Sequence, residues 1–197
     1  MGFDCGEVKA GGPFRLLWTY YIHKDISYPY YRLEPPVTPL PSYETLSPSL
    51  FKAFLAFGAS LRGEASTIEL GLRDLINIRA SQINGCAFCV DMHVKEATMR
   101  GERPLRLHHI AIWRESPLFT QRERAALEWT ETLTLVAGRG VSEAVRAHVR
   151  EHLTDQELSD LTFCVMAING WNRVSIGFGN VPGSKDAAYG LTNSGLT

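Results

Sequence analysis

Cys86, Cys89 and His93 form a Cys-x-x-Cys-x-x-x-His pattern, which combines two thiols with an imidazole. An α-helix advances by about 100° per residue, so these three positions fall within an arc of roughly 60°. Both sulfurs and the imidazole therefore share one face of a helix. Such a set of side chains can perform dithiol–disulfide chemistry or bind a metal ion.

The predicted helix gives both thiols a reason to ionise. Cys86 stands at the helix N-terminus, where unpaired N–H groups and the positive end of the helix dipole favour a thiolate. His93 lies one turn beyond Cys89, which is close enough for proton exchange. A thiol with an ordinary pKa of about 8.5 is only about 3% thiolate at pH 7, whereas a pKa of about 6 gives about 90%. Spacing alone favours Cys86 as the nucleophile.

Two other interpretations of the pattern stay open, a metal site and a structural coincidence. Zinc needs a fourth ligand, and Asp74, His108 or His109 could supply it in space. The sequence has no second CxxC or HxxxH at the spacing of structural zinc modules. Among thiol redox folds, thioredoxin places its CxxC after a β-strand, whereas here a helix is predicted before it.

Local signals predict helices from Ser47 onward. The first is predicted to end at Gly63, and Ser66 with Glu69 reads as a capping box that opens the next. Further starts and stops follow along the chain: Asn84-Gly85 as a stop, Cys86 as a start, Gly101 as a stop, Pro104 as a start, Thr120 with Glu123 as a capping box, Gly138 as a stop, Ser142 as a start, and Thr154 with Glu157 as a third capping box.

The last predicted helix, after Thr154, is apolar on most sides and is expected to be buried. Cys164 lies in its apolar run and is expected to be a packing residue. No alternation of strands and helices appears, so the sequence predicts an all-α fold. The predicted organisation is an aromatic and proline-rich N-terminal arm at 1–46, with a short hairpin within 1–33, then a helical domain at 47–183 and a tail at 184–197.

Composition restricts the partners. The 197 residues include 20 Lys and Arg against 21 Asp and Glu, with no block of either sign, so neither nucleic acid nor an anionic membrane is an expected partner. No stretch approaches the roughly 20 apolar residues of a membrane span. Four cysteines are too few for a disulfide scaffold, and a CxxC pair in that setting indicates redox or metal chemistry in the cytoplasm.

The run from Asp74 to His93, with Asn84-Gly85-Cys86-Ala-Phe-Cys89 at its centre, resembles the AhpD-like alkylhydroperoxidase branch of the carboxymuconolactone decarboxylase superfamily. The later run Ala167-Ile-Asn-Gly-Trp-Asn-Arg173 resembles the final core helix of that branch, so the likeness extends over about residues 45–183. The resemblance implies a compact bundle of about six or seven helices that assembles as homotrimers or homohexamers.

The resemblance also implies the role of each site residue. Cys89 is the attacking thiolate, Cys86 resolves it as a disulfide, and His93 and Asp74 relay protons. The implied substrate is a small organic hydroperoxide, electrons come from a dithiol donor (a small protein or a lipoyl-type group), and no cofactor is implied. This sequence departs from the family at Asp74, where Glu is usual, and at Phe88, where the best-known peroxidases have His.

Two other functions remain as alternatives: a lyase of the lactone decarboxylase type, suggested only by the superfamily, and a non-enzymatic redox sensor. Arg79 and Arg173 are candidates to pair with Asp74 or to orient an anionic substrate. His108 and His109 point about 100° apart on a helix, so at most one of them could approach the thiols.

Overall fold

The structure is a computed structural model that describes residues 40–63 and 66–196. The predicted hairpin within 1–33 and most of the predicted N-terminal arm lie outside these residues. The described residues contain nine α-helices, two short 3-10 helices and no strand, which confirms the all-α prediction. Seven of the nine α-helices have six residues or more.

Helix bounds are as follows: α2 (Tyr43–Leu46), α3 (Pro48–Ser60), α4 (Leu70–Asn84), α5 (Ala87–Met99), α6 (Pro104–His109), η1 (Ile110–Ile112), α7 (Gln121–Thr134), α8 (Glu143–Arg150), α9 (Asp155–Gly177), α10 (Asp186–Tyr189) and η2 (Leu191–Ser194).

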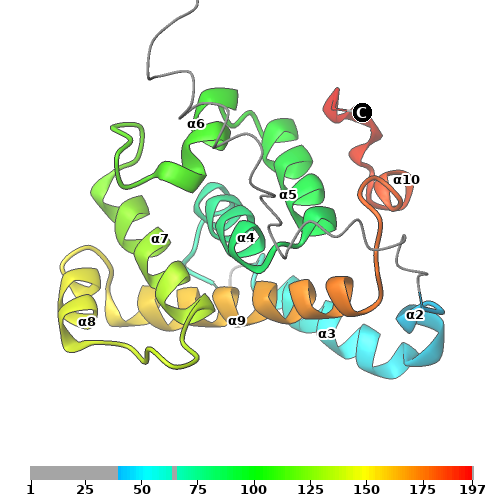
Figure 1. The fold of residues 1–197 in the computed structure, drawn as a ribbon, viewed down its shortest axis with the longest axis horizontal. Helices are drawn as coiled ribbons and strands as arrows, with labels where there is room; N and C mark the ends of the chain where they lie inside the picture. The colour runs from blue at the N-terminus through cyan, green and yellow to red at the C-terminus, as the bar shows by residue number, and fades with distance from the viewer. Residues whose placement is uncertain (1–39, 64–65, 197) are drawn as a thin grey trace, which may run out of the picture. The chain divides into compact units, whose positions relative to one another are not determined.

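Helix α4 lies at the centre, in contact with α5, α7 and α9, and the long α9 runs past them (Figure 1). The apolar side chains in the middle of α4 are completely buried, with Leu75, Ile76 and Ile78 at 0% exposure. Burial of each such side chain contributes about 1.5–3 kcal/mol, so α4 forms the axis of the core. The rest of the core comes mainly from α7 and α9, through Ala126, Leu127, Leu161 and Val165.

Two of the three predicted capping boxes are present, at the starts of α7 and α9. Thr120 and Glu123 each accept a hydrogen bond from the other's backbone N–H, and Thr154 and Glu157 do the same. Each pair satisfies amides that the first helical turn leaves without partners.

The capping box predicted at Ser66 is wrong. Helix α4 begins at Leu70 with Glu69 as its N-cap, and no side chain caps it. The backbone N–H and the hydroxyl of Thr67 both donate to Asp160 Oδ2 on α9, at 2.8 and 2.7 Å. This tertiary contact holds the chain extended, so the helix starts later than the local signal indicates.

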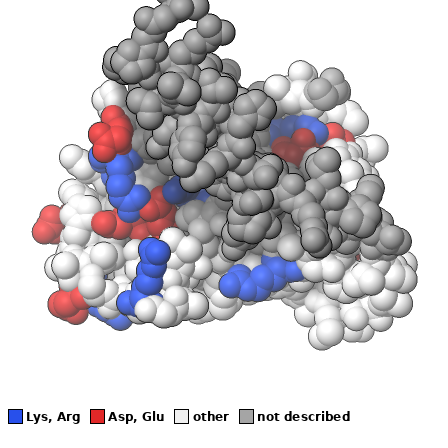
Figure 2. Space-filling view, in the orientation of Figure 1, with Lys and Arg blue, Asp and Glu red and all other residues white. Residues whose placement is uncertain are grey.

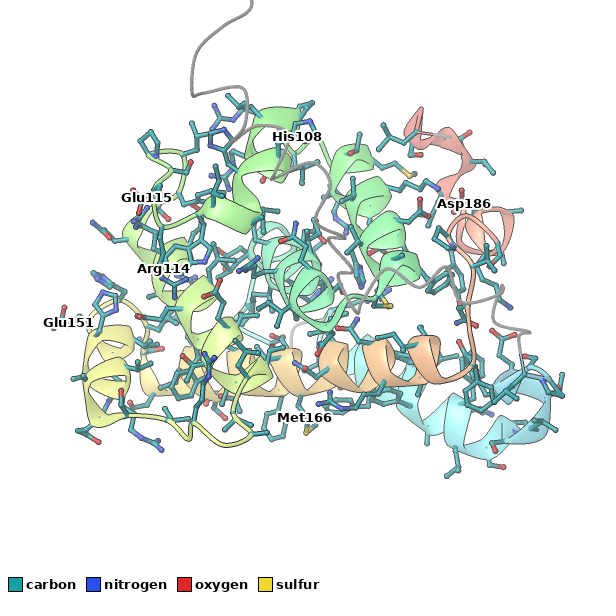
Figure 3. All side chains as sticks on the ribbon, in the orientation of Figure 1. His108, Arg114, Glu115, Glu151, Met166 and Asp186 are labelled. Carbon is teal, nitrogen blue, oxygen red and sulfur yellow. A yellow bond between two sulfur atoms is a disulfide. The ribbon has the colours of Figure 1, made fainter. Side chains whose placement is uncertain are left out.

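Helix α9 is only partly buried in the single chain. Leu161, Val165 and Ile168 are in the core, but Phe163 and Met166 are 48% and 53% exposed, which differs from the burial expected on most sides. Figure 3 shows Met166 at the outer side of α9.

Residues 184–196, which composition predicts as a tail, form α10 and η2 beside α5. Lys95 of α5 is buried and donates to Asp186 of α10, which is labelled in Figure 3, at 2.7 Å and to Asp91 at 2.9 Å. Gly183 N–H also donates to Asp91 Oδ2, at 3.0 Å. These contacts fasten the C-terminal segment to α5.

Basic and acidic side chains lie side by side on the face drawn in Figure 2, in line with their near balance in the sequence. Within the described ranges, no helix is both long enough and apolar enough to cross a membrane.

Candidate functional site

The turn between α4 and α5 positions the two cysteines. Gly85 adopts φ +69°, the left-handed conformation that favours glycine, and ends α4. The next residue, Cys86, donates its N–H to Ser81 O at 3.0 Å and becomes the N-cap of α5. The turn predicted at Asn84-Gly85 and the helix start at Cys86 are both confirmed.

A buried polar network holds this turn against α9. Asn84 Nδ2 donates to Asn172 Oδ1 at 2.8 Å and to Asn169 Oδ1 at 3.0 Å. Asn172, which is 0% exposed, donates in turn to Ser81 Oγ at 3.0 Å. Fully satisfied buried networks of this kind stiffen the backbone around them. The residues Ala167–Arg173, identified in the sequence by resemblance, thus contribute the support of the cysteine turn.

Cys86 and Cys89 form a disulfide with Cα atoms 5.3 Å apart. Both residues are buried, at 2% and 1% exposure, and Phe88 and Met92 pack around them. Cys89 N–H also points at Cys86 Sγ, at 3.3 Å. The N-terminal amides of α5 would stabilise negative charge on a sulfur here once the bond is reduced. The pair therefore has the geometry of an oxidised redox dithiol on a helix.

His93 follows Cys89 by one turn and is 4% exposed. Its Nδ1 lies 2.8 Å from Glu96 Oε2 on the same helix. Burial by itself raises the pKa of Glu96, but the hydrogen bond with His93 and the charges of His93 and Arg100 outweigh it and lower this pKa to about 2. The carboxylate beside His93 is therefore ionised at neutral pH.

Asp74 is buried at 2% exposure and is held by Arg100 of α5. Arg100 Nε donates to Oδ2 at 2.7 Å and its terminal nitrogen donates to Oδ1 at 2.5 Å, a two-pronged contact that uses both carboxylate oxygens. Burial raises the pKa of Asp74, and the Arg100 hydrogen bonds oppose that rise. Arg100 also approaches Glu96 Oε2 at 3.6 Å, so it lies between two carboxylates.

Sequence reasoning missed Glu96 and Arg100. Both continue the spacing of three and four residues that relates Cys86, Cys89 and His93, and that spacing was the available signal.

The arginines proposed as partners of Asp74 lie elsewhere. Arg79 Nε donates to Glu131 Oε1 at 2.6 Å, and Arg173 donates to the backbone oxygen of Asn169 at 2.9 Å. His109 Nδ1 contacts Ser116 Oγ at 3.0 Å, and His108 is exposed on α6 (Figure 3).

Cys164 is 2% exposed in the core, and burial raises the pKa of its thiol to about 11. In the described part of the chain, no three His, Cys, Asp or Glu side chains converge to hold a metal ion.

Comparison with known proteins identifies the family. Residues 48–132 match the carboxymuconolactone decarboxylase family. The uncharacterized protein YdfG of Bacillus subtilis is 42% identical over 120 residues, which span 61% of this chain and 82% of YdfG. This chain belongs to the carboxymuconolactone decarboxylase family.

Solved structures refine this to an AhpD-like member of the family. A crystal structure from Agrobacterium tumefaciens, a protein of unknown function whose name refers to AhpD and antioxidant defence, is 39% identical, with a TM-score of 0.70. The match covers 74% of this chain and 98% of that one. An uncharacterized peroxidase-related protein from Ralstonia eutropha, described as an AhpD core, has a TM-score of 0.64 at 24% identity and covers 72% of this chain and 75% of its own, which supports the fold alone. The AhpD-like resemblance and the helical fold that it implied are confirmed.

Proposed function

We propose that this chain is a dithiol peroxidase that reduces small organic hydroperoxides, with Cys89 as the attacking thiolate and Cys86 as the resolving thiol. AhpD-like family membership supports a peroxidase-related function in general. The observation that supports dithiol peroxidase chemistry in particular is the Cys86–Cys89 disulfide at the start of α5, with a buried His93 one turn further on.

The reaction balances with these three side chains and one dithiol donor. The Cys89 thiolate attacks the outer oxygen of the hydroperoxide, the O–O bond breaks, and the departing alkoxide takes a proton from His93 to become the alcohol. Cys86 then attacks the Cys89 sulfenic acid, which forms the disulfide and releases water. The dithiol donor reduces the disulfide by thiol exchange and leaves as its own disulfide.

The dithiol donor, a small protein or a lipoyl-type group of the cytoplasm, is part of this proposal, and no bound cofactor is needed.

The proposal also includes assembly of the chain into homotrimers or homohexamers. The exposed apolar side chains on α3 and α9 support assembly, because isolated chains rarely leave such patches in water. They include Leu50, Leu55, Phe163, Met166 and Ile176.

The proposal is tested by an assay that supplies cumene hydroperoxide as the substrate, a dithiol donor, and no hydrogen peroxide. Wild type should consume the hydroperoxide catalytically. Cys89→Ser should lose that consumption. When the donor is left out, Cys86→Ser should consume about one equivalent and then stop with Cys89 as a sulfenic acid, because no resolving thiol is present. Cys164→Ala is the matched control and should retain turnover. The proposal is wrong if Cys89→Ser turns over as fast as wild type.

Two further measurements on the wild-type protein distinguish the two alternative functions. A lyase of the lactone decarboxylase type does not need the dithiol, so its activity would survive thiol alkylation. A redox sensor would change its oligomeric state on oxidation while hydroperoxide turnover stayed negligible.

A further inference from the structure

Helix α5 carries a thiol, an imidazole, a carboxylate and a guanidinium in sequence along one face. Cys89, His93, Glu96 and Arg100 are spaced by four, three and four residues, so they follow one face of the helix. His93 Nδ1 lies 2.8 Å from Glu96 Oε2, and a terminal nitrogen of Arg100 lies 3.6 Å from the same oxygen. This series of side chains thus begins at the disulfide and ends at an ion pair.

Asp74, the carboxylate that the family resemblance assigns to the proton relay, is hydrogen-bonded to Arg100. Both oxygens of Asp74 accept hydrogen bonds from Arg100, at 2.7 and 2.5 Å. Asp74 is also one methylene shorter than Glu, the residue usual at this position in the family. His93 has instead a carboxylate of its own helix within hydrogen-bond distance.

We propose that Glu96, in place of Asp74, is the positioning residue for His93 in the thiol chemistry. This inference rests on the proposed function of the dithiol. An ionised carboxylate only accepts hydrogen bonds, so the Nδ1 atom that faces Glu96 carries the proton. Neutral His93 is then the Nδ1–H tautomer, so Nε2 is the nitrogen that can accept a proton from a thiol.

The surroundings of Glu96 support its ionised state. Its hydrogen bond to His93, the Arg100 guanidinium and the more distant charge of Arg62 all favour the carboxylate, against the effect of burial and of Asp74 on α4. Its outer side lines a cavity of about 280 Å³, so water reaches this charge. The other residues around that cavity are Met99, Arg100, Tyr189 and Leu191.

Glu96 acts through His93 and touches no reacting atom. When Nε2 takes the Cys89 proton, the resulting imidazolium is stabilised by the Glu96 charge, which makes the thiolate easier to form. The imidazolium later returns that proton to the departing alkoxide. Glu96 stays a carboxylate throughout, while Asp74 and Arg100 hold the end of α5 against α4.

The test compares Glu96→Gln, Glu96→Asp and Asp74→Asn in the full chain, with the dithiol reduced. The pH dependence of alkylation by iodoacetamide reports the thiolate directly. Loss of a charged hydrogen-bond partner is worth about 1.5 kcal/mol or more, so Glu96→Gln should move the midpoint up by about one pH unit and slow alkylation about tenfold at pH values well below the wild-type midpoint. Glu96→Asp keeps the carboxylate and should recover most of that rate.

Asp74→Asn is the comparison variant and should move the midpoint much less than Glu96→Gln does, because Asp74 makes no hydrogen bond to His93 in the described residues. The inference is overturned if Asp74→Asn moves the midpoint and Glu96→Gln does not, or if Glu96→Gln slows alkylation equally at every pH. Nitrogen-15 NMR of His93 gives a second readout, since the Nδ1–H tautomer should be present in wild type.

Neither readout depends on hydroperoxide turnover. A dithiol that shows the Glu96-dependent midpoint but consumes no hydroperoxide would contradict the proposed function while leaving the role of Glu96 supported.

Discussion

Arg100→Met removes both hydrogen bonds that the buried Asp74 carboxylate receives. Breaking a buried ion pair by removing one partner destabilises a protein by about 3–5 kcal/mol. The Arg100 side chain is 35% exposed, so water screens the pair and partly replaces the lost bonds. We therefore expect the free energy of unfolding to fall by about 2 kcal/mol at pH 8, which is below that range.

The loss should depend on pH in a defined direction. Burial already raises the pKa of Asp74, and Arg100 opposes that rise, so its removal raises the pKa further. The variant's deficit is then full above the new pKa of Asp74 and shrinks as the pH falls through it, because the protonated carboxyl is tolerated in the core.

Urea unfolding of the oxidised protein at pH 8 and pH 5, at one protein concentration, measures both effects. The double variant Asp74→Asn, Arg100→Met completes a thermodynamic cycle and should show a favourable coupling between the two residues. An equal deficit at both pH values, or none at pH 8, would refute the account of this pair.

Three further outcomes follow from other contacts. Asn172→Ala removes one of the two acceptors of the Asn84 amide and the donor to the Ser81 hydroxyl, and urea titration should show a loss of about 2–3 kcal/mol. Thr154→Ala removes the cap of α9 and should lower the unfolding free energy by about 1 kcal/mol in the same assay. Cys164, with its pKa raised by burial to about 11, should remain unmodified when the reduced native protein is alkylated at pH 7.5 and mapped by mass spectrometry.

Ser66→Ala serves as the control for the capping prediction, because the Ser66 hydroxyl accepts a turn hydrogen bond from Ile68 N–H and does not cap α4, which begins at Leu70. Its effect should be smaller than that of Thr154→Ala. Equal losses for the two variants would contradict the helix start observed at Leu70.

Local signals predicted the parts of the fold that local interactions determine. The caps at Thr120 and Thr154 and the left-handed Gly85 need only neighbouring residues, and each is where the sequence indicates. Ser66 carries the same kind of signal, but a hydrogen bond from Thr67 to Asp160, 93 positions away, overrides it.

The candidate site likewise contains residues that local spacing predicts and residues that only tertiary packing brings together. Cys86, Cys89 and His93 were identifiable because one helix places them on one face, and Glu96 follows the same spacing. The partner of Asp74 could not be predicted, since Arg100 is 26 residues away and meets it only when α4 packs on α5. The link from Asn84 to Asn172 spans 88 residues and depends on α9 in the same way.

Trapping the oxidised cysteine shows directly whether Cys89 is the thiol that attacks the hydroperoxide. The reduced Cys86→Ser protein would receive one equivalent of cumene hydroperoxide in the presence of dimedone, which labels sulfenic acids, followed by peptide mass spectrometry. We expect the label on Cys89, with a stoichiometry close to one per chain. An unlabelled Cys89, with the hydroperoxide unconsumed or the label on Cys164 instead, would contradict this expectation.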